Sequence, residues 1–354
     1  MKIIAEIGVN HNGDIAEAKD LVSSAARAGA THVKFQMFDP ELLVSPQAPL
    51  AKYQIDNGVL GKSQFEMLEA LSLNRDEILE LDEFSSNLGL PIIATPFDLG
   101  SLSFLVSELK HSTIKIGSGD LTFVQLIFEA AKSGADLIIS TGMSYLREVE
   151  NAVEFALAGR AVFEGALQDD FSPTRANLKD LPRVKKKNSW LTLLHCTSTY
   201  PAPSDQINIT AISELGNFDA NLGYSDHSLS SHASVMALAL GAEVFEKHLT
   251  LKKDAEGPDH AASLDPEQFS QYVTDLRIAE SSMGDGVKRP QTSEIDVRGV
   301  ARRSLFAAQP MRAGSPTADL IALRPASYVS AESYYEILKT LASTDYSVGD
   351  PIID

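Results

Sequence analysis

Short runs of β-branched and other apolar residues alternate with amphipathic stretches along most of this 354-residue chain. Apolar runs of about four to eight residues predict buried strands, and apolar positions spaced at helical intervals predict helices. The predicted strands are 2–9, 31–38, 91–97, 112–118, 135–141, 189–197, 220–226 and 242–250. The predicted helices are 14–29, 64–89 with a break near Leu73, 99–110, 121–133, 144–158, 205–216, 229–241 and 265–283. Asp14 and Gly29 are expected to cap the first of these helices.

This order gives eight strand–helix units within residues 1–284, close to the size of a (β/α)8 (TIM) barrel. Doubly wound sheets also alternate strands and helices, but eight evenly repeated units favour a closed barrel. Residues 156–188 interrupt the repeat, and their polar, proline-containing composition predicts a surface insertion.

The chain after the last predicted barrel helix has a different composition. Residues 285–298 are polar and rich in Gly and Pro, which predicts a linker. Residues 299–354 contain short strand-like runs and turns, which predict a small, mainly β domain with little core of its own. We therefore expect this small domain to pack against another surface.

Composition and charge exclude several classes of function. The net charge of −18 makes nucleic acid and anionic lipid unlikely partners. No apolar stretch reaches the length of a membrane helix, about 18 residues, and the N-terminal residues lack a signal-peptide core, so no membrane association is expected. The one cysteine, Cys196, fits a reducing compartment, so we expect a cytoplasmic protein and interpret Cys196 as buried packing.

Polar residues stand at or near the carboxyl end of every predicted strand. They are Glu6, Lys34, Gln36, Thr95, Lys115, Ser118, Ser140, Thr141, His195, Ser225, Asp226, His227, Glu246 and His248. In a (β/α)8 barrel these ends meet at one face, where the active site lies. Burying several charges without a functional reason would cost several kcal/mol each, so the pattern predicts an active site.

His227 and His248 follow two successive strands. An isolated histidine at such a place is more often structural, but two on neighbouring strands favour a shared divalent metal. Two imidazoles with oxygen ligands suit Mn²⁺, Fe²⁺, Co²⁺ or Zn²⁺ better than Mg²⁺. We expect Mn²⁺, with Mg²⁺ or Co²⁺ as alternatives.

Lys34 and Lys115 point to the same face of the predicted barrel. In so acidic a chain they indicate an anion site, and with nearby hydroxyl groups and the backbone amides of 117–119 they could hold a phosphate and a carboxylate. The alternative is that each lysine pairs with a carboxylate, Glu6 or Glu246. Glu6 is also a candidate for proton transfer.

Nine motifs resemble the sialic acid synthase family and occur in its order. They are "IIAEIGVNHNG", "VKFQ", "ATPFD", "IKIGSGD", "ISTGM", "LLHCTSTYPAP", "GYSDHS", "FEKHLT" and "GPDHAASLDP". The later segment "VARRSLFAAQPMRAG" resembles the small antifreeze-like (SAF) domain of that family. The resemblance implies a transferase that condenses phosphoenolpyruvate with an N-acetylhexosamine, such as N-acetylmannosamine, to give a nine-carbon 2-keto-3-deoxy sugar acid and phosphate. A diamino-dideoxy hexose, as used for legionaminic- or pseudaminic-type acids, is the alternative acceptor.

The resemblance also implies residue roles. The matching catalytic positions are Glu6, Lys34, Lys115 and Asp120, the last where members of the family commonly have Glu. The matching substrate positions are Thr95, Ser118, Ser140, Ser198, Tyr200, Ser225, Glu246 and Asp259. His227 and His248 match metal ligands, and Arg324 matches an arginine that reaches the partner's sugar site in a domain-swapped homodimer.

Two other functions would use the same barrel. A metal-dependent aldolase or related keto-acid synthase would need no phosphate donor, and the two lysines argue against it. A catalytically silent coat or binding protein would be expected to have lost a metal histidine or a strand-end lysine, and this chain keeps both kinds of residue.

Overall fold

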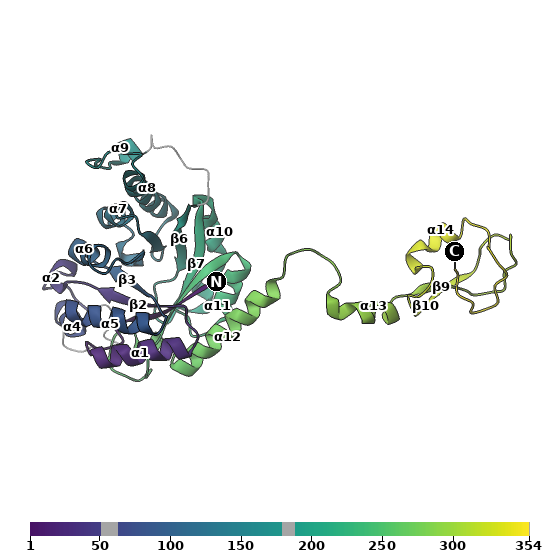
Figure 1. Cartoon of the computed structure of the whole chain (residues 1–354), viewed down its shortest axis with the longest axis horizontal. Helices are drawn as coiled ribbons and strands as arrows, with labels where there is room; N and C mark the ends of the chain where they lie inside the picture. The colour runs from purple at the N-terminus through teal and green to yellow at the C-terminus, as the bar shows by residue number, and fades with distance from the viewer. Residues whose placement is uncertain (51–62, 179–187, 354) are drawn as a thin grey trace. The chain divides into compact units, whose positions relative to one another are not determined.

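The computed structural model describes residues 1–50, 63–178 and 188–353, which form two compact units, Met1–Met283 and Gly284–Asp354. The strands of the first unit are β1 (Lys2–Gly8), β2 (His32–Met37), β3 (Ile92–Pro96), β4 (Thr113–Ile116), β5 (Asp136–Ser140), β6 (Asn188–Cys196), β7 (Ala220–Asp226) and β8 (Ala242–His248). They are parallel and close into a barrel in chain order, with β8 bonded to β1 (Figure 1). The predicted (β/α)8 barrel is therefore confirmed.

Helices lie around the barrel (Figure 1). They are α1 (Ile15–Arg27), α2 (Pro40–Leu43), α4 (Gln64–Leu71), α5 (Arg75–Asn87), α6 (Leu99–Ser107), α7 (Val124–Lys132), α8 (Leu146–Phe163), α9 (Arg175–Leu178), α10 (Ile212–Leu215), α11 (His232–Ala239) and α12 (Pro266–Met283). The Asp14 side chain accepts hydrogen bonds from the first turn of α1, and Gly29 follows that helix with a φ of +87°. Within the described ranges, none of the helices is long and apolar enough to cross a membrane.

The interior of the barrel is layered. Side chains alternate between the two faces of a strand, so residues two apart share a face. One interior layer is apolar and consists of Ile4, Ile93, Ile138, Leu194 and Val244. Two positions further along the same strands, towards their carboxyl ends, lie Glu6, Thr95, Ser140, Cys196 and Glu246. The apolar layer therefore closes the barrel below a polar layer.

Two predicted elements differ in the structure. Helix α8 continues to Phe163, so residues 156–163 belong to a barrel helix and not to the predicted insertion. Gly159 looks like a helix end in the sequence, but an added Cβ there would lie 2.2 Å from the carbonyl oxygen of Phe128, so the glycine permits close packing of α8 against α7. Of the rest of the insertion, 179–187 lie outside the described residues.

The helix predicted at 205–216 is not continuous, because this segment forms two 3-10 turns, Ser204–Gln206 and Ile209–Ala211, followed by the short α10. Asn208 has a left-handed conformation with a φ of 49°, which interrupts any continuous helix there. The break predicted near Leu73 is confirmed, since it separates α4 from α5.

The second unit contains α13 (Ile295–Ala301), the antiparallel strands β9 (Ser304–Ala307) and β10 (Leu320–Leu323), and α14 (Tyr334–Ile337). Helix α13 lies partly within the predicted linker, where reciprocal hydrogen bonds between Gln291 and Glu294 start a helical turn. The expectation of little core needs correction, because isolated bridges between distant segments enclose a buried apolar cluster. Its members are Leu305, Ala307, Met311, Leu320, Ala342, Tyr346 and Ile352.

Candidate active site

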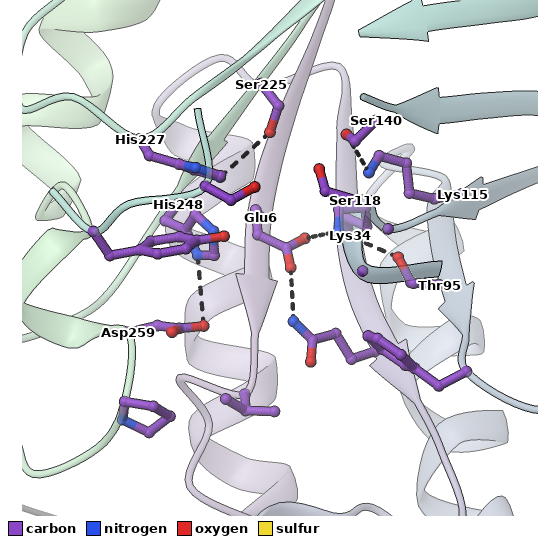
Figure 2. A pocket seen from close by; sticks show the side chains of 18 of the residues that line it. Glu6, Lys34, Thr95, Lys115, Ser118, Ser140, Ser225, His227, His248 and Asp259 are labelled. Carbon is purple, nitrogen blue, oxygen red and sulfur yellow. Dashed lines mark hydrogen bonds and ion pairs between the residues drawn. The ribbon is translucent and has the colours of Figure 1, made fainter. Parts of the chain in front are cut away.

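A cavity of about 400 Å³ opens above the polar layer, at the carboxyl ends of the strands (Figure 2). The predicted site residues that line it are Glu6, Lys34, Thr95, Lys115, Ser118, Ser140, Ser198, Tyr200, Ser225, His227, Glu246, His248 and Asp259. Arg324 lies on the second unit, where its side chain is exposed. The strand-end pattern in the sequence therefore identifies a real cluster of side chains.

Two lysines and two glutamates form a buried ion-pair network on the floor of the cavity. Lys34 Nζ lies 2.8 Å from Glu6 Oε2 and 3.8 Å from Glu246 Oε2. Lys115 Nζ lies 3.7 Å from Glu246 Oε1. The pairing that the sequence left as an alternative is therefore present, and both ammonium groups still line the cavity.

The network shifts the pKa values of its members. Burial alone would lower the pKa of Lys34, but Glu246 and Glu6 outweigh burial and raise it. Burial would raise the pKa of Glu246, but Lys115 and Lys34 outweigh burial and lower it to about 2. For Glu6, burial dominates over the attraction of Lys34, and its pKa is raised. Glu246 is thus the carboxylate that stays ionised, and Glu6 is the carboxyl group better suited to hold a proton.

Hydroxyl groups lie beside both ammonium groups. Lys34 Nζ donates to Thr95 Oγ1 over 3.3 Å, and Lys115 Nζ donates to Ser140 Oγ over 2.7 Å (Figure 2). Ser118 Oγ lies nearby and accepts a hydrogen bond from the backbone amide of Gly142 over 3.1 Å. Ammonium and hydroxyl donors converging on one side of a cavity can bind the oxygen atoms of an anion such as phosphate or carboxylate.

His227 and His248 lie on the other side of Glu6, with ring centroids 5.5 Å apart (Figure 2). His227 Nδ1 donates to the carbonyl oxygen of Thr197 over 2.8 Å, so the neutral form of this ring has its lone pair on Nε2. Burial would lower the pKa of His227, but the neighbouring Cys196 outweighs burial and raises it. Burial and the neighbouring His227 hold the pKa of His248 well below its usual value, so this imidazole is neutral. Its Nδ1 is buried, has no hydrogen-bond partner among the described residues, and lies 3.9 Å from Asp259 Oδ2.

These two imidazoles fit a divalent cation. Nε2 of His227 and the buried Nδ1 of neutral His248 are the nitrogens that could bind a metal, and the latter lacks any other partner in the described part of the chain. No group of three His, Cys, Asp or Glu side chains with the spacing of metal ligands occurs in residues 1–50, 63–178 and 188–353. A cation here would therefore take two protein nitrogens and complete its coordination with oxygen atoms of substrate or water.

Cys196 and Asp120 differ from the other predicted residues in how they relate to the cavity. Cys196 is buried, as predicted, and it also lines the cavity, with its Sγ 3.7 Å from His227 Nδ1. The alternation that places Leu194 in the apolar layer places Cys196 in the polar one. Asp120 ends a short 3-10 turn outside the described lining of the cavity, and burial raises its pKa to about 6.

Sequence reasoning missed the apolar part of the cavity. It is formed by Val9, Leu43, Val44, Met67, Leu68 and Leu71, which we call the apolar wall. These residues follow β1 and β2 or lie on α4, and none of them belongs to the polar strand-end pattern. The available signal was the helical spacing of the apolar residues of α4.

A closed (β/α)8 barrel with a buried, charged cavity at the carboxyl ends of its strands defines the class of barrel enzymes. Residues 21–288 match the NeuB family, and the chain belongs to this family. The resemblance to sialic acid synthases is therefore confirmed, and the chain is an enzyme of a family that makes sugar acids.

Relatives with known names support this membership. The chain is 37% identical over 354 residues to N,N'-diacetyllegionaminic acid synthase of Legionella pneumophila, covering 99% of this chain and 93% of that protein. It is 30% identical over 325 residues to N-acetylneuraminate-9-phosphate synthase of Mus musculus, covering 91% and 82%. The crystal structure of N-acetylneuraminic acid synthetase from Leptospira borgpetersenii in complex with citrate superimposes with a TM-score of 0.66 at 30% identity, covering 83% and 89%.

Proposed function

We propose that this enzyme condenses phosphoenolpyruvate with an N-acetylated amino sugar and water, giving a nine-carbon 2-keto-3-deoxy sugar acid and phosphate. The observation that carries the proposal is the division of one cavity into two halves. Buried lysines and hydroxyl groups lie on one side of Glu6, and the imidazoles of His227 and His248 lie on the other. The first half suits an anionic donor, and the second suits a carbonyl acceptor.

The side chains of this enzyme then have distinct tasks. Lys34 and Lys115 bind the phosphate and carboxylate of the donor and stabilise the charge on the departing phosphate. The donor's C3 attacks the aldehyde carbon of the acceptor, water adds at C2, and phosphate leaves with cleavage of its C–O bond. Glu6, with its raised pKa, lies where it can transfer a proton during these steps. A cation held by His227 and His248, with Mn²⁺ first and Co²⁺ or Mg²⁺ as alternatives, would polarise the acceptor's aldehyde oxygen.

For the acceptor we propose the diamino-dideoxy hexose in preference to N-acetylmannosamine. Support comes from the relative at 37% identity, whose name specifies N,N'-diacetyllegionaminic acid, against 30% for the N-acetylneuraminate-9-phosphate synthase. This was the alternative acceptor in the sequence analysis, and similarity now favours it.

We further propose that the second unit is an antifreeze-like (SAF) domain and that the enzyme is a domain-swapped homodimer. The support is the resemblance of "VARRSLFAAQPMRAG" to that domain, together with the exposure of Arg324. In this arrangement Arg324 would contact the sugar in the partner's barrel. The single cysteine supports a reducing, cytoplasmic location.

Two measurements on one reaction mixture test the proposed function. Purified protein, Mn²⁺ and phosphoenolpyruvate are combined with each candidate acceptor, and released phosphate and the mass of the product are determined. We expect equal amounts of phosphate and a nine-carbon keto acid, and bridging ¹⁸O in the donor should appear in the phosphate. A metal-dependent aldolase would release no phosphate, and a silent binding protein would give no product.

A matched pair of lysine variants controls this experiment. Lys115→Met should abolish product formation, while Lys288→Met, which removes an exposed lysine, should leave it unchanged. Absence of a keto acid with every acceptor would refute the proposed function.

A further inference from the structure

We propose that the apolar wall binds the end of the acceptor sugar that is remote from its aldehyde, and that it selects methyl-bearing deoxy sugars over sugars with a free hydroxymethyl group. This inference rests on the proposed function and names a structural basis for the choice of acceptor. The residues that make up the wall are all apolar, and none of them can take part in acid–base or anion chemistry.

The wall is a packed surface and not a set of isolated side chains. Val9, Met67 and Leu71 form a buried cluster, with exposed fractions of 5%, 6% and 8%, and Leu68 packs against it. Met67, Leu68 and Leu71 lie on α4 at a spacing that places them on one face of the helix. All four also line the cavity, so the cluster presents a continuous apolar surface to whatever occupies it.

The position of the wall in the barrel matches the remote end of an acceptor. Its residues come from the segments after β1 and β2, and β1 lies between β8 and β2. An acceptor whose aldehyde faces His248 on β8 can therefore extend past Glu6 on β1 to the wall. On the side of His227 the ring of Tyr200 lines the cavity, 4.1 Å from the ring of His227, centroid to centroid.

The cost of burying a hydroxyl group against the wall sets the preference between acceptors. A hydroxyl group pressed against the wall would lose its hydrogen bonds to water without gaining a partner, whereas a methyl group would gain apolar contact. An apolar pocket discriminates against a substrate that differs by an added hydroxyl group by up to about 100-fold in kcat/KM. Gln36 and Gln64 also line the cavity and can pair with the polar atoms of an acetamido group, whose methyl then faces the wall.

A series of three acceptors tests the inference on the unmodified enzyme with Mn²⁺ and phosphoenolpyruvate. The acceptors are N-acetylmannosamine, its 6-deoxy derivative, and 2,4-diacetamido-2,4,6-trideoxymannose. We expect kcat/KM for both 6-deoxy acceptors to exceed that for N-acetylmannosamine at least about 10-fold. Equal or better use of N-acetylmannosamine would overturn the role of the wall while leaving the proposed function intact. No keto acid from any acceptor would refute the proposed function itself.

Two leucine variants link the preference to the wall. Leu68 is half-buried, so Leu68→Asn puts a polar group on the wall without opening its buried centre. We expect it to lower kcat/KM for the 6-deoxy acceptors at least about 10-fold and leave the KM for phosphoenolpyruvate unchanged. Leu79→Asn, at a position 42% exposed on α5, is the control and should change neither. An unchanged acceptor preference in folded Leu68→Asn would overturn the inference, and the unmodified enzyme decides the matter if this variant does not fold.

Discussion

A buried ion pair behind the two imidazoles allows a quantitative prediction. Asp226 directly precedes His227, and Lys247 directly precedes His248. Because side chains alternate along strands, Asp226 and Lys247 face away from the cavity when the neighbouring positions face into it. Each is only 1% exposed.

The contacts of this pair join three elements. Lys247 Nζ lies 3.1 Å from Asp226 Oδ2 and also donates to the carbonyl oxygens of Ser228 and Ser230. Asp226 accepts further hydrogen bonds from Ser234 Oγ and from the backbone amide of Ser228, both over 2.8 Å. The pair thus ties the loop after β7 to β8 and α11.

Replacing one member of the pair should lower the free energy of unfolding substantially. Replacing both members should lower it by less than the sum of the two single losses. Breaking a buried pair costs about 3–5 kcal/mol, and Lys247→Met should lie near about 3 kcal/mol because Asp226 keeps two other donors. We expect a similar loss for Asp226→Asn. The double variant should lose less than the sum of the single losses by about 1–3 kcal/mol, because no uncompensated charge remains. Urea unfolding followed by circular dichroism at pH 7 measures all three values.

An exposed pair provides the control for this cycle. Arg277 lies 3.2 Å from Glu280 on the surface of α12, with side chains 44% and 40% exposed, so Arg277→Met should cost less than about 1 kcal/mol. We also expect Lys247→Met to weaken Mn²⁺ binding about 10- to 100-fold, since each member of the pair fixes the backbone directly before one of the two histidines. A loss of stability below about 1 kcal/mol for Lys247→Met, or strict additivity of the two changes, would refute this reasoning.

Three further predictions concern the metal, a shifted carboxyl group and the second unit. His248→Ala should abolish turnover and leave the circular dichroism spectrum unchanged; full activity of metal-stripped enzyme in chelator would contradict a metal role. Because burial raises the pKa of Asp120 to about 6, its ionisation disfavours the folded state, so stability should fall as the pH rises from about 4 to 6. Asp120→Asn should lack this loss, so its urea midpoint should rise relative to that of the unmodified protein as the pH increases across that range. Parallel pH profiles of the two midpoints would contradict this. Arg324→Ala should raise the KM of the sugar more than that of phosphoenolpyruvate, and mixing it with Lys115→Ala should restore some activity; no recovery after verified subunit exchange would contradict a contribution in trans.

The sequence predicts the barrel and most of the cavity because both depend on local patterns. A strand reveals itself by its apolar run, and the parallel arrangement brings all carboxyl ends together, so Lys34, Lys115, His227 and His248 could be assigned to one site. The direction of Cys196 follows from the same alternation once Leu194 is known to point inward, but the sequence does not show which of two neighbouring residues faces the interior.

Features that depend on contacts between distant segments could not be predicted. Gly159 lies within α8 because that helix approaches the Phe128 carbonyl of α7, and no local signal distinguishes this from a helix end. Likewise, Met67 and Leu71 have the pattern of ordinary core residues, and only the closed barrel shows that their cluster borders the cavity.

The charges of the cavity floor explain why imidazole ligands suit this site. The positive charges of Lys34 and Lys115 are balanced in part by ionised Glu246, whereas Glu6 is the carboxyl group better suited to hold a proton, so the network keeps some positive charge for an anionic donor. Carboxylate ligands for a cation would add further negative charge to a chain that already carries −18. Imidazoles add none, so a divalent cation on His227 and His248 would contribute its full charge beside the donor. Binding of donor and of cation would then favour each other, and by linkage the effect is equal in both directions.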